Sequence, residues 1–314
     1  PKQMTSASEG KSEQSYLQGQ KTLEKKTVRE SPQKVTAFPN AFVAKFLGAC
    51  MWILENLADQ IIECCRQEND IRTLMSTQTT QSKTKRLREA RQELLATSNW
   101  RDAEGRQIKE LPFPILQCEG SSWTMSAYWP PKHWKTMSVV VTLLQASTAS
   151  LVAFSSGARH HEISDTTGDE ANDQPPSISA STYKYSGTLG GIFRSWPIGE
   201  VAQRAIATQK RLAELRRGDE ATHLWVLNRN TSTRRSGDPS ASLSVLSQLA
   251  ARNLEMEDLA EGRAHIHRWR HTIAKLIGVT VDEAQEILQD LFGHNDPEHT
   301  LWYLMSDPLI AEEA

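Results

Sequence analysis

The sequence predicts a mainly α protein with a small antiparallel β-sheet. Apolar residues recur at helical spacing over residues 41–65 and again over residues 134–154. Residues 177–185 instead alternate and are rich in Ser, Thr and Tyr, and a glycine-containing turn separates them from residues 192–197. That arrangement is typical of a β-hairpin, so we expect two antiparallel strands set among helices.

Composition and pattern divide the chain into three segments. Residues 1–35 are rich in Lys, Glu, Gln, Ser and Thr and poor in apolar side chains, which predicts a disordered arm or linker. Residues 36–130 are expected to form a helical N-terminal extension, and residues 131–314 the main domain. Beyond the hairpin, further helices are expected at residues 243–253, 257–276, 282–291 and from about residue 297 onward.

The distribution of charge along the chain says more about possible binding partners than the net charge does. The 314 residues carry a formal net charge of −2, so the chain as a whole is not a basic protein. Residues 204–275 contain thirteen Lys or Arg against eight Asp or Glu, whereas residues 282–314 contain nine Asp or Glu and no Lys or Arg. A locally basic face is typical of phosphate binding, and equally of a solvated helix surface.

Cysteine use and hydropathy indicate a reduced, cytoplasmic protein. The four cysteines form no C-x-x-C pair, so neither a zinc site nor a disulfide framework is expected. No apolar run approaches the ~18–20 residues that cross a bilayer, and no signal peptide follows Pro1. A start without Met favours a fragment of a longer protein.

Six residues in the second half of the chain can be interpreted as one phosphate-transfer site that needs no metal and no cofactor. Two arginines from distant segments can bind phosphate oxygens bidentately and stay charged. A tyrosine, with a pKa of about 10, is a nucleophile once its developing charge is stabilised. Each residue alone is more often an ordinary surface or core residue, and their joint order and spacing favour the site. The six are Arg159, Lys184, His267, Arg270, His294 and Tyr303.

The roles within this set follow from spacing. His267 lies three residues before Arg270, so both project from one helix face. His294 follows a glycine, from which position it can donate to a non-bridging oxygen. Lys184, near the tip of the hairpin, is a flexible cationic acid for the leaving oxygen.

The motifs that carry these residues resemble those of the tyrosine recombinases, the family of phage integrases and Xer-type resolvases. Ser156-Gly-Ala-Arg159-His-His-Glu162 is similar to the family's first arginine box, and His267-Arg-Trp-Arg270-His-Thr272 to its second. Leu291-Phe-Gly-His294 and Thr300-x-x-Tyr303 match its last two boxes. Departures are Ala158 and Phe292, where larger apolar residues and Leu are usual, and an acidic insertion over residues 168–176.

The resemblance implies that residues 131–314 are a recombinase catalytic domain from a mobile element. Tyr303 would attack a DNA phosphodiester and form a 3′-phosphotyrosyl link, without metal or ATP. The implied partners are double-stranded DNA and three further copies in a tetramer on DNA, with no membrane. A type IB topoisomerase-like enzyme and a DNA-binding module with an idle site are the alternatives. Additional DNA contacts are expected from Arg229, Arg234, Arg235 and Arg268.

Overall fold

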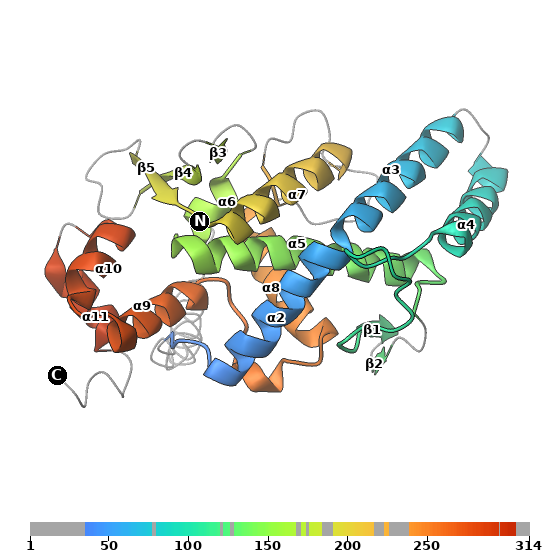
Figure 1. The fold of residues 1–314 in the computed structure, drawn as a ribbon. Coiled ribbons are helices and arrows are strands. Elements are labelled where there is room, and N and C mark those ends of the chain that lie inside the picture. The colour runs from blue at the N-terminus through green and yellow to red at the C-terminus, as the bar shows by residue number, and fades with distance from the viewer. Residues whose placement is uncertain are drawn as a thin grey trace, which may run out of the picture. The chain divides into compact units, whose positions relative to one another are not determined.

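Helix α5, Trp134–Ser156, lies at the centre of the packing, and α2, α7, α8 and α9 all contact it (Figure 1). The computed structural model describes residues 35–76, 80–119, 122–125, 129–167, 171–173, 176–183, 191–216, 223–225, 239–294 and 296–305. Within these residues the chain is mainly α with two small antiparallel sheets, which confirms the predicted class. The helix predicted at 134–154 is this central element.

The sequence predicts no apolar segment long enough to cross a bilayer, and α5 corrects that expectation. Among the described residues, α5 is long and apolar enough to cross a membrane, and α2 with α3 pass the same test only as a bent pair. However, 78% of the apolar window of α5 is buried inside the protein. A helix that is apolar all round is expected in a protein core as well as in a membrane.

The helix predicted over residues 41–65 is wrong as a single element, because the chain bends at Leu57. Helix α2 covers Asn40–Asn56 and α3 covers Ala58–Leu74, and their axes differ by 59°. The Leu57 N–H donates to the Ile53 carbonyl at 3.0 Å, and its own carbonyl accepts from Ile61 at 2.9 Å. Leu57 is itself buried, so the apolar periodicity runs through the bend.

The helix predicted over residues 257–276 is also divided. A 3₁₀ turn, η1, is followed by an irregular segment before α9 begins at Arg268. Glu261 has a φ of 47° and Gly262 a φ of 112°, and neither angle continues a right-handed helix. The helices beyond α2, α3 and α5 are α4 Thr80–Thr97, α6 His160–Asp165, α7 Glu200–Arg216, α8 Pro239–Asn253, η1 Asp258–Ala260, α9 Arg268–Thr280, α10 Ala284–Phe292 and α11 Pro297–Leu304. Of these, α8, α10 and α11 agree within a few residues with the helices predicted at residues 243–253, 282–291 and from about residue 297 onward.

The predicted hairpin is confirmed by β4 and β5, which pair antiparallel over Ser177–Thr182 and Ile192–Pro197. The short strand β3, Ala171–Asp173, extends this sheet on the other side of β4, Pro176–Thr182. A second sheet pairs β1, Leu116–Glu119, with β2, Ser122–Met125.

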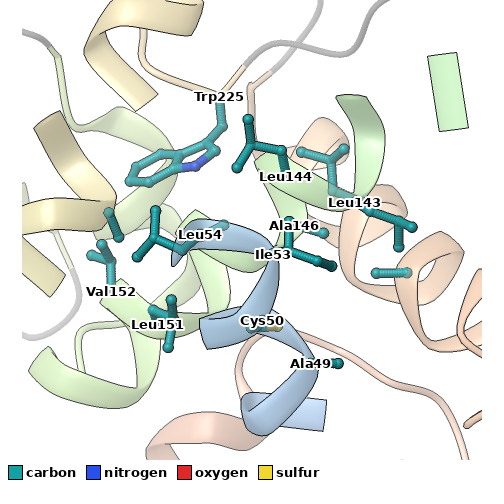
Figure 2. Packing of buried hydrophobic residues seen from close by; sticks show 14 of the residues in the cluster. Ala49, Cys50, Ile53, Leu54, Leu143, Leu144, Ala146, Leu151, Val152 and Trp225 are labelled. Carbon is teal, nitrogen blue, oxygen red and sulfur yellow. The ribbon is translucent and has the colours of Figure 1, made fainter. Parts of the chain in front are cut away.

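One hydrophobic core joins residues on both sides of the boundary predicted at residue 130. Figure 2 shows Ile53 and Leu54 of α2 in one cluster with Leu144 and Leu151 of α5 and with Trp225. Thr36–Ala314 forms one compact unit. A smaller cluster packs α9, α10 and α11 together through Ala274, Leu288, Phe292 and Leu304. The predicted arm at residues 1–35 lies, apart from Val35, outside the described residues.

Arg268, predicted to contact DNA, has a structural role instead. Its side chain is buried, and its guanidinium donates to the carbonyls of Thr36 at 2.9 Å, Ala37 at 3.0 Å and Ala260 at 2.7 Å. The guanidinium carbon also lies 4.3 Å from the ring centroid of Phe38. These contacts direct the guanidinium of Arg268 to residues 36–38.

Replacing Arg268 by Ala should therefore destabilise the fold strongly. The substitution removes the charged donor from the carbonyls of Thr36, Ala37 and Ala260, and of these bonds the one to Ala260 is buried. We expect the free energy of unfolding to fall by about 1.5–3 kcal/mol. Chemical denaturation of R268A measures this change, and R106A, at an exposed ion pair with Asp102, is the matched control. A loss equal to that of R106A would contradict the structural role of Arg268.

Candidate active site

The first arginine of the site is held by a buried carboxylate. Arg159 is the residue that precedes α6, and its Nη1 donates to Glu162 Oε1 at 3.0 Å and to Thr182 Oγ1 on β4 at 3.1 Å. The Glu162 side chain is fully buried, whereas that of Arg159 remains 11% exposed. These contacts fix the guanidinium between α6 and the sheet and leave one edge of it open.

Gly157 connects the end of α5 to the second arginine. Its φ of 61° lies in the left-handed region, and a Cβ atom at this position would lie 2.8 Å from Phe292 Cε1. Its carbonyl accepts a hydrogen bond of 2.6 Å from Arg270 Nη1. The position therefore requires glycine both for its backbone and for the close approach of Phe292.

Arg270 is the most buried cation of the site. Its side chain is 1% exposed, and Nη2 donates to the Phe292 carbonyl at 3.2 Å and contacts His294 Nε2 at 3.0 Å. None of its hydrogen bonds to the described residues reaches a carboxylate. Burial lowers the pKa of Arg270 to about 10, while Tyr303 opposes that change and Arg159 adds to it. The guanidinium thus stays charged at neutral pH.

His294 is held next to Arg270 in a defined tautomer. An arginine Nη2 can only donate, so Nε2 of His294 accepts and Nδ1 carries the proton. Nδ1 lies 2.9 Å from the hydroxyl of Thr300, which accepts from it. Burial, followed by the charges of Arg270 and Arg159, lowers the pKa of His294 to about 3. His294 is therefore neutral at physiological pH, with its lone pair directed to Arg270.

Tyr303 lies on α11 against imidazole and guanidinium groups. Asp296 caps this helix by accepting from the Glu298 N–H at 3.0 Å, and Pro297 begins it, as predicted. The phenol ring stacks on His294 with centroids 5.6 Å apart and lies 4.7 Å from the ring of His271. The guanidinium carbon of Arg270 lies 5.4 Å from the phenol centroid.

His267 lies immediately before α9, and its ring centroid is 5.3 Å from that of His271. Burial, followed by the neighbouring His271 and Arg270, lowers the pKa of His267 to about 3. The pair with Arg270, predicted from their spacing, therefore faces one site. At neutral pH, His267 is a neutral imidazole that can accept a proton.

The structure thus brings together Arg159, His267, Arg270, His294 and Tyr303. Three neighbours were not predicted as site residues. His271 and Thr300 each stand inside a motif that the sequence displays, whereas Arg194 of β5 has no motif to mark it. The predicted Lys184, Arg229, Arg234 and Arg235 lie outside the described residues.

The described part of the chain holds no group of three His, Cys, Asp or Glu side chains placed to bind a metal ion. Fold and site together define a mainly α protein in which a tyrosine, several imidazoles and two guanidinium groups converge. Hydrogen-bond donors and a nucleophile of this kind suit a phosphate ester.

Comparison with known proteins finds similarity among solved structures alone. No protein-family model and no curated protein matches the sequence. The chain is similar to a crystal structure of XerA recombinase, at 14% identity and a TM-score of 0.41, over 95% of this chain and 93% of that one. It is also similar to the Tn1549 transposon integrase in complex with transposon right-end DNA, at 14% identity and a TM-score of 0.40, over 79% and 83%. A lambda integrase dimer bound to a core site matches at 12% identity and a TM-score of 0.33, over 92% and 94%. Similarity of this extent assigns no activity, so the chemistry has to come from the side chains.

Proposed function

We propose that this chain cleaves and rejoins DNA strands through a 3′-phosphotyrosyl intermediate, as a site-specific recombinase or integrase. The observation that supports this most is the buried Arg270, whose hydrogen bonds within the described part of the chain go to neutral acceptors, beside the phenol of Tyr303. A buried cation without a carboxylate is costly, and an anionic ligand offsets that cost.

In the proposed reaction, Arg159 and Arg270 bind the non-bridging oxygens of a DNA phosphodiester. The Tyr303 hydroxyl oxygen forms a bond to phosphorus while the bond from phosphorus to the 5′-oxygen breaks. One phosphodiester replaces another, so no ATP is consumed. Attack of a free 5′-hydroxyl on the phosphotyrosine reverses the step and joins the strands.

Two proton transfers accompany this exchange. The phenolic proton passes to an imidazole nitrogen, either of His271, whose ring lies 4.7 Å from the phenol ring, or of His267 next to it. A bound phosphate raises the pKa of His267 from about 3, because the added negative charge favours imidazolium. The leaving 5′-oxygen takes a proton from a general acid, the role predicted for Lys184.

The same proposal specifies the partners. The substrate is double-stranded DNA in the cytoplasm, where the chain acts at the nucleoid, and four copies assemble on it to exchange strands. Phe292, His294 and Tyr303 surround Arg270, so a bound phosphate takes the place of some of these contacts.

A supercoiled plasmid library with randomised inserts tests the proposal without knowledge of the target site. The full chain is incubated with the library in EDTA and the reaction is stopped with detergent, which traps a covalent protein–DNA adduct. Peptide mapping should place that adduct on Tyr303. Recovery of no adduct, an adduct on another residue, or cleavage that requires a divalent metal would each contradict the proposal. Relaxation without strand exchange would favour the type IB topoisomerase-like activity.

A further inference from the structure

Arg194 faces the candidate site from the middle of strand β5. In the register of the sheet it pairs with Ala180, and the neighbouring pair on the same face joins Thr182 to Ile192. Trp196, two residues further along and on the same face, is buried, and the guanidinium carbon of Arg194 lies 5.3 Å from its ring centroid. Thr182 and Arg194 therefore project from one face of the sheet. Thr182 contacts Arg159, and Arg194 contacts the opposite side of the site.

The guanidinium of Arg194 caps the C-terminus of helix α10. Nη2 donates to the carbonyls of Asp290 and Leu291, the latter at 3.0 Å. Carbonyls at a helix C-terminus lack partners within the helix, and a cation there is favoured by the helix dipole. Arg194 thus donates to two carbonyls in the last turn before Gly293, of which that of Asp290 also accepts from the Gly293 N–H at 3.0 Å.

The same guanidinium lies directly against Gly293. A Cβ atom at this glycine would lie 1.6 Å from Arg194 Nη1 and 2.3 Å from Cζ, and the φ of Gly293 is 61°. The left-handed φ favours glycine here, and a side chain at this position would have to displace the Arg194 guanidinium. An open cavity of about 480 Å³, lined in part by Arg194, Gly293 and His294, borders the contact.

The turn held in this way supplies most of the contacts of Arg270. Phe292 provides a carbonyl acceptor, and its ring lies 3.6 Å from the guanidinium carbon. His294 provides the Nε2 acceptor at 3.0 Å. A displacement of the turn therefore moves His294 and loosens Arg270 together.

We propose that Arg194 is a positioning residue, which clamps the turn at Gly293 onto β5 and so holds His294 and Arg270 in the geometry for strand transfer. The inference rests on the proposed function, because strand transfer is the reaction that this geometry serves. Arg194 acts through the turn and does not itself contact the phosphate. Lysine cannot fully replace Arg194 in this role. Its compact ammonium group lacks the planar guanidinium that donates to two carbonyls while it packs against Gly293.

The test compares R194A, R194K and G293A with the double variant R194A/G293A, in the full chain. Misplacement of catalytic groups by about 1 Å costs about 100-fold in rate, and we expect adduct formation at Tyr303 to slow by about 10- to 100-fold in R194A. DNA affinity, measured by mobility shift, should stay unchanged. R194K should recover only part of the rate, and R106A should react as the wild type does.

Two further readouts separate positioning from general damage. His294, titrated by NMR, should show a higher pKa in R194A, since a neighbouring cation is lost. The G293A substitution should slow adduct formation less when Arg194 is already Ala than when it is Arg, because the clash with the guanidinium is then gone. If G293A slows adduct formation equally with and without Arg194, and the pKa of His294 is unchanged in R194A, the inference is overturned.

The outcomes also separate this inference from the proposed function. If the wild type forms no adduct at Tyr303, the proposed function fails. The His294 titration and the thermal stabilities of the four variants then still decide whether Arg194 holds the turn. If the wild type forms the adduct and R194A forms it at the same rate, only the positioning role fails.

Discussion

Replacing Tyr303 by Phe should abolish the covalent adduct and leave DNA binding intact. The substitution removes only the hydroxyl oxygen, which is the atom that would bond to phosphorus. The ring contacts to His271 at 4.7 Å and to His294 at 5.6 Å stay available to phenylalanine, so α11 should remain in place. No other phenol of the described chain lies near Arg270 in the contacts observed.

The measurement uses the supercoiled library in EDTA, with adduct formation followed on denaturing gels and DNA binding by mobility shift. Tyr183 provides a matched control, because it is an exposed tyrosine at the end of β4 and its hydroxyl has no role in the proposed reaction. Y183F should react at the wild-type rate. Adduct formation by Y303F would show that another residue is the nucleophile, whereas loss of DNA binding would show that the phenol holds the binding surface.

The sequence predicts the helices well wherever one periodic pattern matches one straight element. It fails at Leu57 because the 59° bend there needs neither Pro nor Gly and keeps both apolar faces on one core. It fails again at Gly262, although glycine is a common signal for the end of a helix. Local periodicity shows which side of a helix is buried, whereas the position at which the chain bends from one helix into the next depends on tertiary packing.

Within the candidate site, the residues that carry motifs could be found and those that depend on tertiary register could not. Arg268 and Arg270 stand two positions apart in one motif, which places them about 200° apart around α9. Arg270 therefore faces Tyr303 and Arg268 the segment at Thr36, a difference that the helix period alone predicts. The contact of Arg194 with Gly293 depends on the pairing of β4 with β5 and on the end of α10, about which the sequence is silent.

Replacing Arg270 by Lys should slow adduct formation by about 100- to 1,000-fold, which corresponds to about 2.7–4 kcal/mol of transition-state stabilisation. Lysine keeps the positive charge but cannot bond to the Gly157 carbonyl, the Phe292 carbonyl and His294 at once, as Arg270 does. The negative charge on the non-bridging oxygens then loses a fixed pair of donors in the transition state, while long-range attraction for DNA is retained.

Single-turnover adduct formation measures this effect, and mobility shift measures DNA affinity in parallel. Because Arg270 is almost fully buried, the thermal stability of R270K has to be compared with that of R268K, a second buried arginine on the same helix. R268K should lose stability and keep its cleavage rate per folded molecule, whereas R270K should lose the rate even where it is folded. A wild-type rate in folded R270K would remove Arg270 from the proposed phosphate site, since a residue that binds the reacting oxygens cannot be exchanged without cost.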